Sequence, residues 1–267
     1  MSEAPRQPAE TKPAATILLL RDEPQFEVLM VKRHHQIDFA SGALVFPGGK
    51  THAGDDDPAW AEHCIGWDQF DPVQRGLRIA AIREAYEEAG ILIAAGLDGA
   101  HFAEVCDPQV RAAVDRGETA FLDVVKDLGV RLRLDALTVF ARWITPTMMP
   151  KRFDTWFYAM RAPADQVAAA DGREAVDAEW IAPAEVLRLA DAGERTVIFP
   201  TRMNVQLLAE ATSAADCVAR ADQRELVTVL PVVEVRDGAR FLVIPPNAGY
   251  GDVAEPMDRI AAESRAG

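Results

Sequence analysis

Residues 77–91 read Leu-Arg-Ile-Ala-Ala-Ile-Arg-Glu-Ala-Tyr-Glu-Glu-Ala-Gly-Ile and predict one helix that stops at its glycine. At about 100° per residue, Glu84, Glu87 and Glu88 share one face, and an apolar set lines the opposite face. Like charges at these spacings repel each other, so a bound cation would stabilise the helix. A hard divalent metal held through oxygen is the natural candidate, and a solvated acidic face is the alternative.

The composition limits the partners. The chain has 267 residues, with 42 acidic and 28 basic side chains and a formal net charge of −14. No basic stripe is present to displace counterions, which argues against nucleic-acid binding. Cys64, Cys106 and Cys217 are widely spaced, as expected of free thiols in a reducing compartment. With no signal peptide or membrane span in the sequence, we expect a cytoplasmic protein with a small-molecule partner, as a monomer or a homodimer.

Three parts are expected along the chain: a flexible N-terminal arm (1–13), a main domain (14–195) and a C-terminal extension packed on it (196–267). Within the main domain, residues 56–75 carry several aromatic side chains and predict an ordered insertion. Trp60, Trp67 and Phe70 are expected to pack the insertion onto the body, with an aromatic wall for an adenine ring as the alternative.

The pattern of elements indicates an α/β (α+β) fold. Residues 14–21 and 26–33 predict a β-hairpin, and Pro47-Gly48-Gly49 marks a tight turn or a close approach to another group. Further strands are expected at 43–46, 91–94, 136–144, 152–161, 178–181, 232–235 and 240–244, the last two joined at Asp237-Gly238. Further helices are expected at 107–115, 119–128, 183–192, 201–211 and 214–221.

The glycine pair and the acidic helix together resemble the Nudix hydrolases, whose box reads Gly-x5-Glu-x7-Arg-Glu-aliphatic-x-Glu-Glu-x-Gly-aliphatic. Gly49 takes the leading glycine position, and residues 83–91 match the second half. Asp55 stands where the box has glutamate, and about twenty extra residues then separate it from Arg83. The resemblance implies a Nudix fold, in which a mixed β-sheet lies between helices.

The interrupted box is similar to that of a Nudix branch of coenzyme A diphosphatases with an insertion at this place, the Nudix-type-motif-19 branch. Further segments that look like this branch are Arg152-Phe-Asp-Thr, the stretch 177–183 and Phe199-Pro-Thr. A coenzyme A signature of a neighbouring branch is matched in part, by Leu29, Arg33, Gly42 and Phe46-Pro47-Gly48-Gly49. Three positions depart from it: Val31, His34 and Asp38, the last replacing an arginine that would meet a phosphate.

The resemblance implies roles for the box residues. Glu87 and Glu88 are the expected ligands of Mg²⁺ or Mn²⁺, and Glu84 is a ligand, a general base or both. Arg83 completes the catalytic set by orienting a glutamate through bidentate pairing, unless it forms only a surface ion pair. The residues expected to approach the substrate are Arg33, Lys50, Gly48 and Gly49.

The implied activity is metal-dependent hydrolysis of a diphosphate linked to a nucleoside. Coenzyme A or an acyl-coenzyme A is the leading substrate, and an ADP-sugar or a dinucleotide polyphosphate is the alternative. A Nudix-fold module that senses a nucleotide without cleaving it is an alternative of another class. Such a module is expected to have lost acidic box residues, whereas Glu84, Glu87 and Glu88 all remain.

Overall fold

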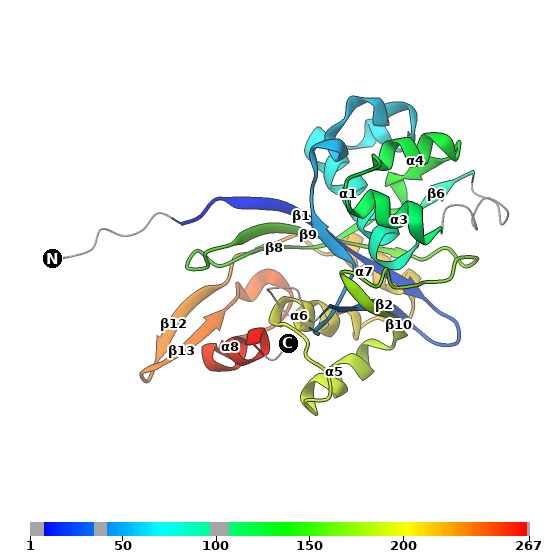
Figure 1. Ribbon diagram of the computed structural model, residues 1–267. Helices are drawn as coiled ribbons and strands as arrows, with labels where there is room; N and C mark the ends of the chain where they lie inside the picture. The colour runs from blue at the N-terminus through cyan, green and yellow to red at the C-terminus, as the bar shows by residue number, and fades with distance from the viewer. Residues whose placement is uncertain (1–7, 35–41, 97–106, 266–267) are drawn as a thin grey trace.

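A computed structural model describes residues 8–34, 42–96 and 107–265 (Figure 1). Asp38 and Cys106, which entered the sequence analysis, lie outside these residues. No helix in the described ranges is long and apolar enough to cross a membrane.

A mixed sheet with strand order β10-β2-β1-β9-β8-β11 forms the centre of the molecule, with β3 added to β2 and β4 added to β1. Its strands are β1 (Thr11–Arg21), β2 (Glu27–Arg33), β3 (Leu44–Val45), β4 (Gly48–Lys50), β8 (Thr138–Ile144), β9 (Arg152–Arg161), β10 (Ala175–Ile181) and β11 (Thr228–Val229). Strand β1 runs parallel to β9 and antiparallel to β2 and β4. It begins three residues before the predicted start, because Thr11, Lys12 and Pro13 already pair with β9.

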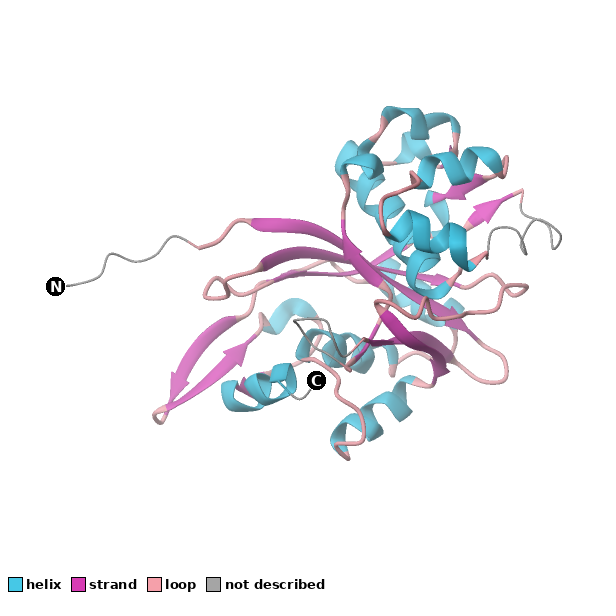
Figure 2. Ribbon diagram, viewed as in Figure 1, coloured by secondary structure: helices cyan, strands magenta, loops and turns pink. Residues whose placement is uncertain are grey.

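Both faces of this sheet are covered by helices (Figure 2). Ile17 and Leu19 of β1 pack on one side with helix α1 (Pro72–Ala89). Leu18 and Leu20 pack on the other side with the C-terminal helices, which are α5 (Pro183–Asp191), α6 (Phe199–Leu208) and α7 (Ala214–Gln223). Successive side chains of a strand point to opposite faces, so a continuous apolar run is what a doubly covered strand requires. The predicted α/β fold, a mixed sheet between helices, is confirmed.

Helix α1 starts five residues earlier than predicted. The Asp71 side chain accepts a hydrogen bond from Gln74 N at 2.9 Å, and Pro72 takes the first helical position. The helix ends where Gly90 adopts a left-handed conformation at φ 68°, as the sequence indicated. The alternative of a solvated acidic face is excluded, because every residue from Gly76 to Ala89 is buried.

The insertion is folded and belongs to the body. It contains two 3-10 helices, η2 (Pro58–Glu62) and η3 (Trp67–Gln69), and the strand β5 (Cys64–Ile65), and a further 3-10 helix, η1 (Ala53–Asp56), leads into it. Strand β5 joins β7 (Arg131–Arg133) and β6 (Ala94–Ala95) in a small sheet. Trp60 is 1% exposed and its ring lies 5.7 Å from that of Phe121. The packing role predicted for the insertion's aromatics is confirmed, and Trp60 is not accessible to an adenine ring.

Two further helices lie over α1, namely α3 (Pro108–Asp115) and α4 (Phe121–Asp127), close to the predicted ranges. The strand predicted at 91–94 is wrong for its first three residues, which are buried but irregular, and only β6 forms a strand. Their apolar run is equally compatible with a buried connection.

The C-terminal extension continues the core. The predicted hairpin is confirmed as β12 (Val232–Arg236) and β13 (Ala239–Val243), with φ 51° at Asp237 and 82° at Gly238. The sequence analysis did not predict β14 (Ala254–Pro256) or α8 (Met257–Arg265), which are short. Trp143 Nε1 of β8 donates to Tyr250 Oη at 3.0 Å, and Tyr250 donates to Asn204 Oδ1 at 2.8 Å. This network ties the part of the extension around Tyr250 to the central sheet, and also to α6 within the extension itself.

Replacing Tyr250 with phenylalanine is expected to destabilise the protein. The change leaves the buried Trp143 and Asn204 without their partner, which costs about 1–3 kcal/mol. Thermal unfolding would show this as a lower Tm, by roughly 2–4 °C per kcal/mol. As a control, Val235→Ala removes an exposed side chain of the same extension and should leave Tm unchanged. An unchanged Tm in Tyr250→Phe would mean that the network does not hold the extension.

Candidate active site

The glycine pair lies in an extended strand beside α1. Gly48 pairs with Thr16 and Gly49 with Ala15 in the β1–β4 ladder, and neither glycine has a positive φ. A Cβ at Gly48 would lie 2.7 Å from Ala15 O, and one at Gly49 would lie 2.5 Å from Glu84 Oε1. Of the two interpretations of this motif, close approach is confirmed and the tight turn is wrong. Gly48 brings the strand against β1, and Gly49 brings it against the acidic helix.

Arg83 is the centre of a buried ionic network. Its Nε and Nη2 donate to the two oxygens of Asp55 at 3.0 and 3.1 Å. Its Nη1 donates to Glu84 Oε1 and to Glu87 Oε2, both at 2.9 Å, and Nη2 also donates to Lys50 O at 2.8 Å. The Arg83 side chain is 3% exposed, so the surface ion pair is excluded. All five N–H groups are used by the protein, which makes Arg83 a positioning residue.

Asp55 has a structural role at the position where the box has glutamate. Besides both bonds from Arg83, its Oδ2 accepts from His52 N at 2.7 Å, and the residue is 2% exposed. The bidentate pairing expected between Arg83 and a glutamate is made with Asp55 instead. The long insertion does not separate these two residues in space, because η1 returns the chain to the middle of α1.

The three glutamates each commit one oxygen to the protein. Glu84 and Glu87 accept from Arg83, and Glu88 Oε2 accepts from Gly48 N at 3.0 Å. The other oxygen of each carboxylate accepts no hydrogen bond from the described residues. For Glu87, this oxygen, Oε1, is also fully buried. Carboxylate oxygens are the ligands that Mg²⁺ and Mn²⁺ prefer. The donor set fits a divalent cation.

Burial shifts the titration of all three carboxyls. It raises the pKa of Glu87 to about 8 against the opposing charge of Arg83, and it raises that of Glu84 in the same way. The pKa of Glu88 lies well above its usual range, because of burial first and the Glu84 charge second. One arginine is too little positive charge for this cluster. In the conformation seen, no three acidic, His or Cys side chains of the described residues converge as a finished metal cage, so metal binding stays a prediction.

Glu174 is a fourth carboxylate that the sequence analysis missed. Burial is the largest cause of the raised pKa of Glu84 and Glu88, and the Glu174 charge is a smaller one, so this exposed carboxylate lies within electrostatic range of the acidic helix. It lies in the turn before β10, where the Asp171 side chain accepts from Glu174 N at 3.0 Å and from Ala175 N at 2.7 Å. The Asp-Gly pair at 171–172 is a turn signal in the sequence, but it does not show where the turn points.

The predicted phosphate contacts differ in position. The charge of Arg33, at the end of β2, opposes the rise in the pKa of Glu88 that burial causes, and the Arg33 Nε is buried without a partner among the described residues. Arg33 therefore borders the carboxylates. Lys50 follows the glycine pair in β4 and is exposed, and its carbonyl supports Arg83. The roles of both side chains toward a substrate stay predictions.

Gly49→Ala is expected to lower the turnover rate by about tenfold to a hundredfold, because its Cβ displaces the Glu84 carboxylate that Arg83 holds. The matched control is Gly54→Ala, where a Cβ meets nothing within 4 Å. Steady-state rates and Tm would be measured for both variants. Equal activity in the two would contradict the close approach of β4 to Glu84.

The fold has a solved counterpart. The crystal structure of a Nudix hydrolase from Alicyclobacillus acidocaldarius superimposes with a TM-score of 0.66 at 26% sequence identity. The alignment covers 79% of this chain and 96% of that one. The architecture is therefore the Nudix fold, as the sequence predicted.

The chain belongs to the Nudix hydrolase family, because the family model described as the NUDT19 Nudix domain matches residues 66–206, more than half of the sequence. The match contains all of α1 and the turn at Glu174. This match confirms the branch that the interrupted box indicated, the Nudix-type-motif-19 branch.

Relatives of known name are similar at modest identity. Acyl-coenzyme A diphosphatase NUDT19 from Xenopus laevis is 27% identical over an alignment of 205 positions, which covers 61% of this chain and 54% of that protein. The alignment thus spans about half the length of that relative. The human protein of the same name is 26% identical, covering 90% and 76%. Putative nudix hydrolase 7 from Caenorhabditis elegans is 23% identical, covering 94% and 79%.

Proposed function

We propose that this protein hydrolyses a diphosphate linked to a nucleoside in a reaction that depends on Mg²⁺ or Mn²⁺, with coenzyme A or an acyl-coenzyme A as the substrate. The observation that carries the proposal is the buried glutamate cluster of α1, in which Glu84 and Glu87 share Arg83, Glu88 accepts from Gly48 N, and each carboxylate keeps one oxygen for a cation. Buried like charges of this kind are costly unless a positive ion compensates them.

The divalent ion would neutralise the diphosphate oxygens and make a bound water more acidic. Glu84, Glu87 and Glu88 would hold it, and the chain fixes two of their carboxylates through Arg83 and the third through Gly48 N. Glu174 lies on another element within electrostatic range of this cluster and is the candidate to take the proton of the attacking water. Arg33 is the candidate to pair with a phosphate of the substrate.

The substrate assignment rests on likeness and on the box insertion. Relatives from Xenopus laevis and human carry the name acyl-coenzyme A diphosphatase. The partial coenzyme A signature around Arg33 and Phe46 agrees with them, whereas Asp38 removes one expected cation. An ADP-sugar or a dinucleotide polyphosphate is the alternative substrate. The net charge of −14 favours such small molecules over nucleic acids, and we assign the reaction to the cytoplasm.

The proposal is tested by incubating the purified protein with Mg²⁺ or Mn²⁺ and a panel of diphosphates. The panel contains coenzyme A, an acyl-coenzyme A, ADP-ribose, NADH and diadenosine polyphosphates, and released phosphorylated products are separated by chromatography. Fastest cleavage of coenzyme A or its acyl derivative is expected. Cleavage of ADP-ribose or a dinucleotide alone would correct the substrate. Tight binding of one compound with no turnover of any would instead show a nucleotide-sensing module.

A further inference from the structure

The segment between β9 and β10, residues 162–174, leads to Glu174 and is attached to the end of the acidic helix. Leu92 N donates to Gln166 Oε1 at 2.8 Å, and Gln166 Nε2 donates to Leu92 O at 2.9 Å. Ala169 N donates to Ala89 O, the last residue of α1, at 2.9 Å. The first half of the segment is therefore fixed relative to the helix that carries Glu84, Glu87 and Glu88.

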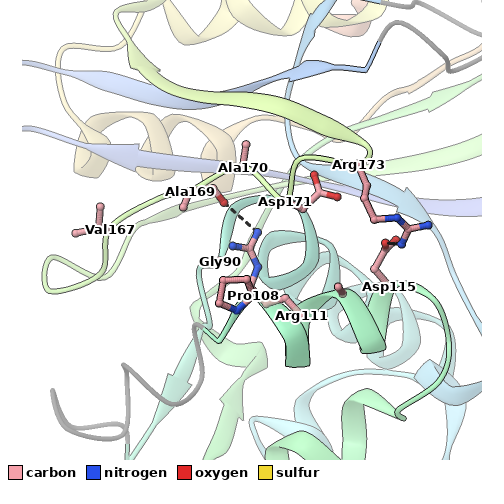
Figure 3. Close-up of a pocket in the computed structure, with 10 residues that line it drawn as sticks. Gly90, Pro108, Arg111, Asp115, Val167, Ala169, Ala170, Asp171 and Arg173 are labelled. Carbon is pink, nitrogen blue, oxygen red and sulfur yellow. Dashed lines mark hydrogen bonds and ion pairs between the residues drawn. The ribbon is translucent and has the colours of Figure 1, made fainter.

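Arg111 of α3 makes a second connection between this segment and α1 (Figure 3). This residue is 5% exposed, and its Nε donates to Tyr86 O at 3.0 Å. Its Nη2 donates to Glu87 O and to Ala169 O, both at 2.9 Å. The buried guanidinium of Arg111 thus joins the backbone of α1, at Glu87, to the backbone of the segment at Ala169. A cation is also favourable at the C-terminal end of a helix.

Asp115 lies one turn further along α3 and forms an ion pair with Arg173, the residue before Glu174 (Figure 3). The turn that follows is closed on itself, because Gly172 N donates to Ala175 O at 2.8 Å and the Asp171 side chain accepts two backbone N–H groups. From the other side, His34 N donates to Glu174 O at 2.8 Å. The α3 contacts and the hydrogen bonds of the turn together fix the backbone position of Glu174.

The space between α3 and this segment is not filled by side chains. A cavity of about 130 Å³ lies there, bounded by Gly90, Pro108, Arg111, Asp115, Val167 and Ala169, among others. Close packing normally fixes the relative position of two elements, and here it is incomplete. Across this space, the polar contacts of Arg111 and Asp115 join the segment to α3.

We infer that helix α3 positions Glu174 against the glutamate cluster, with Arg111 and Asp115 as positioning residues that act through Glu174. The inference rests on the proposed function and assigns α3 a part in it. The Asp115–Arg173 pair is half-exposed on the arginine side, so it contributes little to stability. We expect that breaking it releases the turn without unfolding the protein.

A double-mutant cycle on turnover tests the inference, with variants Arg173→Gln, Glu174→Gln and both together. Arg173→Gln is expected to lower kcat by about tenfold, with KM and Tm unchanged, since small misplacement of a reacting group is costly. In the Glu174→Gln background the same change should have no further effect. The matched control, Arg116→Gln, breaks the exposed pair with Glu118 just beyond α3 and should leave kcat unchanged.

Restoring the pair in reverse gives an independent readout. Asp115→Arg alone should lower kcat as Arg173→Gln does, and adding Arg173→Asp should recover most of the loss. Arg111→Lys, which keeps the charge but not the geometry of the three bonds, should lower kcat more than either. Additive losses in the cycle, no recovery in the swap, or no effect of Glu174→Gln would each overturn the inference. The proposed function fails separately, if the unchanged protein cleaves no diphosphate.

Discussion

Replacing Glu87 or Glu88 with glutamine is expected to lower kcat by about a hundredfold to a thousandfold per residue, with the protein still folded. Each change removes an anionic oxygen that would hold the cation in the transition state. The fold should tolerate it, because burial already opposes the charge of both groups, as their raised pKa values indicate. A neutral amide of the same shape is cheaper to bury.

The measurement is kcat at saturating Mg²⁺ together with Tm without added metal. Tm of both variants should equal or exceed that of the unchanged protein, and a large excess of Mg²⁺ should recover little activity. Glu62→Gln is the matched control, because Glu62 is an exposed glutamate of the insertion. Near-normal rates in both Glu87→Gln and Glu88→Gln would show that the metal assignment is wrong.

Arg83→Met is expected to have the largest effect on stability. It leaves Asp55, Glu84 and Glu87 buried without a cation, and breaking a buried ionic group in this way costs about 3–5 kcal/mol. Arg83→Lys should recover only part of the loss, because one ammonium cannot serve five acceptors arranged around a planar fork. Activity should be lost in both variants, since Glu84 and Glu87 lose their orientation.

Urea unfolding gives the free energy directly, and Arg188→Met provides the control. Arg188 pairs with Glu185 and Glu194 on the surface, so its loss should change the free energy of unfolding by less than about 1 kcal/mol. A divalent ion should partly rescue the stability of Arg83→Met if it binds the same carboxylates. Equal, small losses in Arg83→Met and Arg188→Met would contradict the buried network.

Elements with a strong local signal could be predicted from the sequence. The run from Ile17 to Leu20 is apolar on both faces, as a doubly covered strand requires, and Gly90 supplies the left-handed residue that ends α1. The Asp237-Gly238 turn likewise sets the terminal hairpin. In each case the backbone requirement is local, so composition and spacing are sufficient.

The environment of the site could not be predicted in the same way. Helical spacing places Glu84, Glu87 and Glu88 on one side, but it does not reveal that β4, the insertion and the segment before β10 bury that side. The partner of Arg83 is Asp55, which the insertion places far away in sequence. Glu174 carries no motif, and only the tertiary contacts of its turn bring it to the cluster. These are long-range contacts, which sequence periodicity does not encode.

The account depends most on metal-dependent cleavage of a diphosphate, and one measurement tests it directly. The protein is stripped of metal with a chelator, transferred to buffer made with ¹⁸O-water, and given coenzyme A before and after addition of Mn²⁺ or Mg²⁺. We predict no turnover without the ion, and rapid turnover with it, with one ¹⁸O atom in a single phosphorylated product. Turnover that is independent of the ion, or no cleavage of coenzyme A or any other diphosphate with the ion present, would contradict the account.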